Sequence, residues 1–81
     1  MNKASKAETL REACAAAGLT VAQARERTRE QGRVIRRYRV METLRDRDWS
    51  YPQIAEALGM NQSAIGQSLE RLARIRRAVN G

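Results

Sequence analysis

The sequence contains no histidine and only one cysteine, Cys14, and this removes most catalytic and metal-binding chemistry. A structural zinc site needs about four ligands, mostly Cys and His, and a serine or cysteine nucleophile would lack its usual imidazole base. The five glycines are scattered singly, so the chain has no glycine-rich phosphate-binding loop. We therefore expect no enzyme, no metal or cofactor, and no site for a small-molecule ligand.

Long apolar runs are also absent, and no segment approaches the roughly 20 apolar residues of a membrane span. No basic-then-apolar pattern opens the chain, so we expect neither export nor membrane insertion. A lone cysteine cannot form an intrachain disulfide, which fits a cytoplasmic protein. The chain has 81 residues, 42% of them hydrophobic and 31% charged, and suits one folded domain over 1–81. Residues 1–5 are expected to be flexible.

Positive charge dominates the composition. Sixteen basic residues against nine acidic ones give a formal net charge of +7. Arginine supplies 14 of the 16, and nine arginines against four acidic residues fall within 25–47, a local net charge of +5. Another four arginines fall within 71–77, which contains no acidic residue. Because the guanidinium group makes forked hydrogen bonds to phosphate and guanine, this composition favours a nucleic-acid-binding domain.

Hydrophobic residues recur at spacings of three and four, and nowhere alternate with polar residues over the length of a strand. The sequence therefore predicts an all-α fold, a compact bundle of four to five helices. The first helix is expected over about residues 5–17 and ends at Gly18, where a left-handed cap suits glycine. Its predicted inward residues are Ala7, Leu10, Cys14 and Ala17.

A second helix is expected to begin after Thr20, because Gln23 stands three residues later and completes a capping box. Its predicted inward residues are Val21, Ala24 and Thr28. The polar run RERTREQGR at 25–33 and the helix-weakening Gly32 predict a break around residues 29–33. A third helix of about 14 residues then follows. Its predicted inward residues are Val34, Ile35, Tyr38, Met41 and Leu44.

Residues 50–72, SYPQIAEALGMNQSAIGQSLERL, are the most informative stretch. Ser50 and Gln53 form a second capping box, and Gly59 allows the positive φ of a sharp turn between two helices. The second of these helices is expected to begin near Gln62. Its candidate N-caps are Asn61 and Ser63, and its predicted inward stripe is Ile65, Leu69, Leu72, Ile75 and Val79. Two helices joined by a glycine-centred turn indicate a helix-turn-helix motif.

The outward face of that second helix carries side chains that can read base pairs. Gln and Asn pair bidentately with adenine, Arg pairs with guanine, and an Ala methyl contacts the methyl group of thymine. The residues predicted to face the bases of double-stranded DNA are Gln62, Ser63, Ala64, Gln67 and Arg71. Those predicted to contact phosphates or the adjacent minor groove are Arg25, Arg27, Arg29, Arg33, Arg36, Arg37, Ser50, Asn61 and Arg74.

Two features have more than one interpretation. Gly66 lies on the same helix, where the missing side chain fits either close packing against a neighbour or close approach of DNA. A homodimer, which regulators that read palindromic sites use, would form through the first helix or through the stripe within 72–80. The core of a monomer explains both stripes equally well.

From Gly18 to Gly59 the chain runs GLTVAQARERTREQGRVIRRYRVMETLRDRDWSYPQIAEALG. It contains an Arg-x-x-x-Met pair (Arg37, Met41), a Ser-x-Pro-x-Ile motif (Ser50, Pro52, Ile54) and a basic segment (Arg25, Arg27, Arg29). In these motifs the chain resembles the C-terminal DNA-binding domain of the bacterial chromosomal replication initiator DnaA. The resemblance covers about residues 7–77. It implies a Trp-repressor-like helical fold whose helix-turn-helix docks in the major groove.

The next run departs from that family. The initiator domain has an Asp-His-Thr-Thr-like signature there, whereas this chain has MNQSAI at 60–65. The resemblance therefore implies the architecture and the way of docking, without the origin-box specificity. We expect a small transcriptional regulator, such as a repressor of a phage or mobile element, associated with the nucleoid. Replication-origin binding is the alternative within the same class.

Two other classes of function stay open. A basic adaptor or inhibitor would dock on an acidic protein, and it would bind DNA only weakly and without sequence preference. An RNA-binding protein would need aromatic side chains on which bases stack. Only Tyr38, Trp49 and Tyr51 are aromatic, and Tyr38 lies on a predicted inward face. RNA binding is therefore the least favoured of the three.

Overall fold

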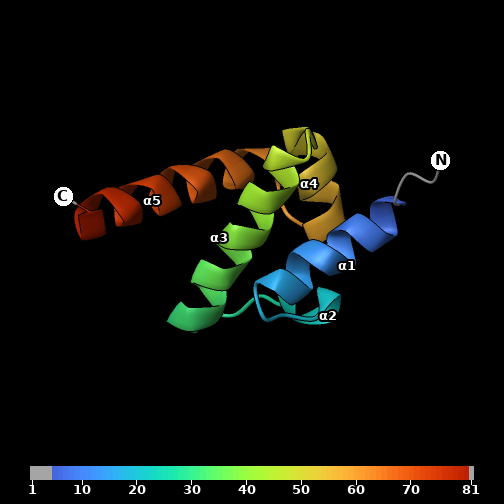
Figure 1. Ribbon diagram of the computed structural model, residues 1–81, viewed down its shortest axis with the longest axis horizontal. Helices are drawn as coiled ribbons and strands as arrows, with labels where there is room; N and C mark the ends of the chain where they lie inside the picture. The colour runs from blue at the N-terminus through green and yellow to red at the C-terminus, as the bar shows by residue number, and fades with distance from the viewer. Residues whose placement is uncertain (1–4, 81) are drawn as a thin grey trace.

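The computed structural model describes residues 5–80, and within this range it is a compact all-α structure of five helices (Figure 1). The helices are α1 Lys6–Ala16, α2 Val21–Arg25, α3 Gln31–Asp46, α4 Tyr51–Leu58 and α5 Gln62–Asn80. The predicted fold class and number of helices are thus confirmed. Residues 1–4, which were predicted to be flexible, lie outside the described part. Ser5 shared that prediction, but it caps α1, since its Oγ accepts a hydrogen bond from the Glu8 amide.

Both predicted capping boxes are present. The Gln23 amide donates to Thr20 Oγ1 at 3.1 Å, and the Thr20 amide donates to Gln23 Oε1 at 2.9 Å. At the start of α4 the Ser50 amide donates to Gln53 Oε1 at 2.8 Å, and the Gln53 amide donates to Ser50 Oγ at 3.3 Å. Each box satisfies two backbone donors that a helix start leaves unpaired, which explains why α2 and α4 begin where the sequence predicts.

The inward face of α3 forms the centre of the core. Val40, Met41 and Leu44 are fully buried, and α1, α4 and α5 pack against the same helix. Cys14 of α1 is fully buried as well, and its burial raises the pKa of the thiol, although the charge of Arg25 opposes that rise. The predicted burial of Cys14 is therefore confirmed. Along the described helices, none is long and apolar enough to cross a membrane.

The break between α2 and α3 lies at residues 26–30, earlier than predicted. Thr28 falls within this connection and not on α2, and its Oγ1 accepts a hydrogen bond from the Glu30 amide at 3.1 Å. Gly32 lies in the first turn of α3, so α3 has 16 residues and not about 14. The entropic cost of ordering glycine applies to the middle of a helix, and Gly32 lies outside it, in the first turn.

The buried face of α1 also differs from the prediction. Ala7 is exposed and lines an open groove beside Trp49, whereas Thr9 and Ala13 are buried. The predicted helical period was correct, but α1 is contacted by α2 as well as by α3. The buried face is consequently wider than a single stripe and rotated away from Ala7.

The largest correction concerns α5. Its inward stripe was predicted to reach Val79, but burial along the stripe ends at Leu72. Ile75 is 37% exposed and Val79 is 80% exposed, although both continue the spacing of Ile65, Leu69 and Leu72. Figure 1 shows the reason, since the C-terminal part of α5 extends past the other helices. Periodicity predicts that these residues share a face, but it does not predict that another element covers that face.

Two glycines offer a matched test of the helix geometry. Gly59 has φ +65, so alanine there would be strained, and we expect Gly59→Ala to lower the free energy of unfolding by about 1–2 kcal/mol. A Cβ on Gly66 would lie 3.5 Å from Tyr51 Cε2, an ordinary contact, so Gly66→Ala should raise that free energy by about 0.5–1 kcal/mol. Urea denaturation followed by circular dichroism measures both. A loss of stability in Gly66→Ala would show that close packing requires the glycine.

Candidate nucleic-acid interface

The turn between α4 and α5 sets which face of α5 points outward. Residues 59–61 connect the two helices, Gly59 is left-handed, and the Met60 amide donates to the Ala55 carbonyl at 2.9 Å. Ile54 and Ile65 are fully buried on either side of this turn. Because these two side chains hold α4 and α5 against the core, the opposite face of α5 is exposed to solvent.

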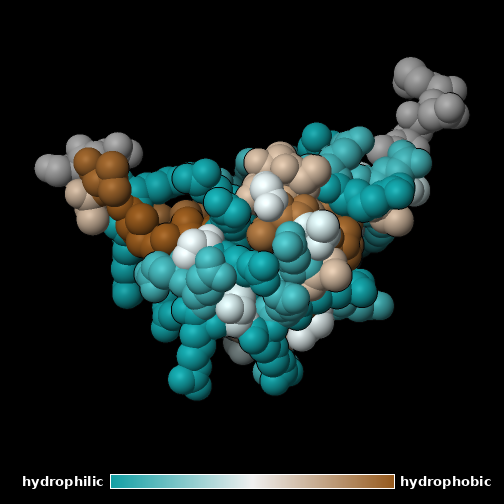
Figure 2. Space-filling view, turned by 90° about the horizontal axis from the view of Figure 1, so that it is seen from below, coloured by the Kyte–Doolittle hydropathy of each residue, from teal (hydrophilic) through white to brown (hydrophobic). Residues whose placement is uncertain are grey.

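That outward face brings together two of the five side chains predicted to read bases, Gln67 and Arg71. Gln67, Glu70, Arg71 and Arg74 line one shallow depression of about 190 Å³. Gln62 and Ser63 are exposed at the start of the helix, and Ala64 is half-buried. Figure 2 views the molecule from another side, and it shows hydrophobic patches on a largely hydrophilic surface. Gln67 and Arg71 therefore share one accessible surface with Glu70 and Arg74.

A carboxylate shares this depression. Glu70 accepts a hydrogen bond from Arg74 Nη2 at 3.0 Å, one helical turn along α5. The pair is more than half exposed, so it contributes little to stability. It does partly neutralise Arg74, and this leaves Arg71 as the arginine of the depression that forms no ion pair with the described residues.

Tyr51 lies where α4 begins and contacts the middle of α5. Its ring is beside Gly66, and the Arg45 guanidinium lies 4.9 Å from the ring centroid. Arg45 also donates to the Trp49 carbonyl at 2.8 Å, which orients it over the ring. Since a Cβ on Gly66 would make only an ordinary contact here, packing does not require glycine at this position.

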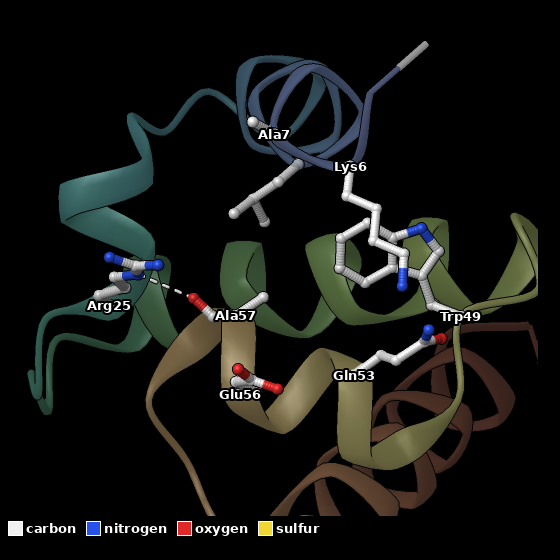
Figure 3. A pocket seen from close by; sticks show the side chains of 8 residues that line it. Lys6, Ala7, Arg25, Trp49, Gln53, Glu56 and Ala57 are labelled. Atoms are coloured by element: carbon white, nitrogen blue, oxygen red, sulfur yellow. Dashed lines mark hydrogen bonds between the residues drawn. The ribbon is translucent and has the colours of Figure 1, made fainter. Parts of the chain in front are cut away.

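Arg25 has a structural contact that the sequence did not indicate. Its Nε donates to the Ala57 carbonyl of α4 at 2.7 Å (Figure 3). The bond crosses one end of a groove of about 510 Å³ between α1, α2 and α4, in which Lys6 lies 5.6 Å from the centroid of the Trp49 ring. Arg25 therefore holds the connection at residues 26–30, which carries Arg27 and Arg29, beside the end of α4 and close to the turn that leads into α5.

The other arginines predicted to contact phosphate fall into two groups. Arg33 forms ion pairs with Glu26 and Glu30, and Nε and Nη2 of Arg37 are buried without a hydrogen-bond partner among the described residues. Arg27, Arg29 and Arg36 are exposed, and within the described chain they form no ion pair. The second group is thus better placed to bind an external anion.

The two predicted residues at helix starts also differ from each other. Ser50 is half-buried, and both its hydroxyl and its amide are used in the capping box of α4. Asn61 is exposed immediately before α5, and its carbonyl accepts a hydrogen bond from the Ala64 amide at 3.0 Å. Of these two positions, only Asn61 is exposed, immediately before the start of α5.

Comparison with known proteins identifies no relative. No protein-family model matches the chain, and neither a curated protein nor a solved structure matches it. The resemblance to the DNA-binding domain of replication initiators therefore rests on the motifs within residues 18–59.

The contact of Arg25 predicts a difference between two neighbouring arginines. Arg25→Ala should lower the free energy of unfolding by about 1 kcal/mol, because a side-chain hydrogen bond to a helix end is lost. Arg27→Ala removes the same charge from an exposed side chain with no such bond, and it should leave stability nearly unchanged. Urea denaturation of both variants measures the difference. Equal stabilities would show that the contact with Ala57 contributes nothing.

Proposed function

We propose that this protein binds double-stranded DNA sequence-specifically and acts as a small transcriptional regulator. In this proposal α4 and α5 form a helix-turn-helix, and the N-terminal half of α5 enters the major groove. The observation that carries it is the exposed face of α5, where Gln67 and Arg71 lie side by side while Ile65 is buried behind them. A net charge of +7 supports the choice of a polyanionic partner.

The side chains on this face match the hydrogen-bonding groups of base edges. A glutamine amide both donates and accepts, so Gln67 suits the N6 and N7 atoms of adenine, and Arg71 suits the O6 and N7 atoms of guanine. Ser63 and Gln62 lie nearer the start of the helix, where recognition helices contact bases. Glu70 would accept a hydrogen bond from the amino group of cytosine. Each correct bidentate contact discriminates by about 1–3 kcal/mol.

Phosphate contacts come from residues outside α5 in this proposal. Arg27 and Arg29 lie in the connection that Arg25 holds beside α4, and their exposed guanidinium groups suit the backbone next to the occupied groove. Arg36 and Asn61 add to them. If these three arginines each neutralise one phosphate, affinity falls about 40-fold between 50 and 200 mM salt.

The resemblance to initiator domains supports the same way of docking and supplies no operator. The run at 60–65, MNQSAI, differs from the signature of that family, so we infer a target other than the replication-origin box. Origin binding is the alternative within the class. As a DNA-binding regulator the protein would act in the cytoplasm, in association with the nucleoid.

Selection of bound duplexes from a random library, at about 150 mM salt, tests this function. Enrichment of a defined sequence supports specific readout, and it also identifies the target. Enrichment of the origin box would favour the initiator-like alternative. No enrichment, with binding that disappears as salt rises, would contradict the proposal and favour a basic module that docks on an acidic protein.

Gln67→Ala tests the assignment of base readout. The variant should bind the selected duplex about 5- to 100-fold more weakly, because a bidentate contact is worth about 1–3 kcal/mol. Binding to a random duplex should stay unchanged, since that binding comes from phosphate contacts. Fluorescence anisotropy titrations with the two duplexes measure both values. An equal loss on the two duplexes would remove Gln67 from the readout.

Arg29→Ala tests the phosphate contacts, with Arg11→Ala as a charge-matched control on the exposed surface of α1. Arg29→Ala should weaken binding to all duplexes alike and reduce the slope of log K against log salt by about one. Arg11→Ala should leave that slope unchanged. The same titrations repeated over a range of salt concentrations provide both slopes. A loss confined to the selected sequence would instead place Arg29 against a base.

A further inference from the structure

The groove between α1, α2 and α4 lies away from the face of α5 that the proposed function uses. Its volume is about 510 Å³, within the range of about 300–1,000 Å³ that small-molecule sites occupy. Leu10 and Trp49 form its apolar floor, and Ala7 and Ala57 extend the apolar lining on either side. The sequence predicted no such site, because these residues come together only when three helices meet.

The two ends of this groove differ in charge. Arg25 and Glu56 lie toward one end, so a positive and a negative side chain are both present there (Figure 3). Lys6 and Gln53 lie at the other end, beside Trp49. Among the described residues that line the groove, only Glu56 is acidic. The end beside Trp49 is therefore the one at which a positive charge is not opposed by a carboxylate of the lining.

Both polar groups at that end have donors to spare. The amide oxygen of Gln53 accepts a hydrogen bond from the Ser50 backbone at 2.8 Å, which fixes the orientation of the side-chain amide. Its NH₂ group donates to no residue of the described chain. The Lys6 ammonium lies 5.6 Å from the centroid of the Trp49 ring, and it forms no ion pair with any described residue. One carboxylate can accept from an ammonium and an amide together.

We propose that this groove binds a small organic anion that has one carboxylate and a flat apolar body. The carboxylate accepts hydrogen bonds from Lys6 and Gln53. The apolar body lies along Leu10 and Ala57 and contacts the part of Trp49 that faces the groove. An apolar lining with a few polar groups at one end is the usual construction of a small-molecule site.

The charges of the groove set the orientation of this ligand. At the opposite end the carboxylate would meet Glu56, and Arg25 already donates its Nε to the Ala57 carbonyl at 2.7 Å. A cationic ligand would be repelled by Lys6. The groove does not include Gln67 or Arg71, so this inference is independent of the proposed function.

Two probes with the same carbon skeleton test the site: phenylbutyrate, which carries a carboxylate, and phenylbutanol, which carries a hydroxyl group. Trp49 is the only tryptophan, so its indole N–H gives a single signal in a nitrogen–proton correlation spectrum. Titration of that signal measures binding in the groove. Phenylbutyrate should bind with a Kd of about 1 mM, as expected for about 12 non-hydrogen atoms. Phenylbutanol should bind about tenfold more weakly, because it lacks the charge-assisted contact.

Two variants separate the contact with the carboxylate from the shape of the groove. Lys6→Gln should weaken phenylbutyrate about 5- to 10-fold and leave phenylbutanol unchanged. Gln53→Glu keeps the capping box, because its carboxylate accepts from the Ser50 amide, but it places a negative charge beside the ligand. This variant should abolish binding of phenylbutyrate and not of phenylbutanol. The control is Arg11→Gln, which removes one charge from α1 outside the groove and should change neither affinity.

Three results would overturn the proposal. The first is a Trp49 signal that does not move at about 20 mM phenylbutyrate. The second is an equal affinity for the acid and the alcohol. The third is an equal effect of Lys6→Gln and Arg11→Gln. None of these measurements uses DNA, so a failure of the proposed function would leave this site standing.

Discussion

The burial of one face of α3 is the interaction on which the rest of this structure depends. Val40, Met41 and Leu44 are fully buried, and three other helices complete their surroundings. A chain of this size has room for one core only, so every helix is oriented by its contact with that core. This packing also sets the outward face of α5. The side chain of Ile65 is buried in the core, so Gln67 and Arg71 lie on the exposed side of the helix.

The arginines of the chain serve two different purposes, and the structure separates them. Some stabilise the fold: Arg25 donates to the end of α4, Arg45 lies over Tyr51, and Arg76 joins α5 to α3. Others, such as Arg27 and Arg29, are exposed on the connection that Arg25 holds in place. The basic composition is therefore not one continuous binding surface. Among the structural arginines, Arg25 positions the connection that carries Arg27 and Arg29, which the proposed function assigns to phosphate.

The two halves of α5 also differ in role. Its first half packs on α4 and presents polar side chains, while its second half carries Ile75 and Val79 with no cover from the described chain. One continuous helix joins the two halves, so the exposed apolar face lies at a fixed distance from the polar face.

The sequence by itself determined the local features: the all-α class, the capping boxes at Thr20 and Ser50, the left-handed turn at Gly59 and the inward position of Ile65. These depend on hydrogen bonds and spacings within a few residues, which a single sequence displays directly. Only the tertiary structure decided that Arg25 contacts Ala57, that Thr28 lies outside α2 and that the stripe on α5 is covered no further than Leu72. Those outcomes depend on which elements meet, and helical periodicity identifies a face without identifying what packs against it.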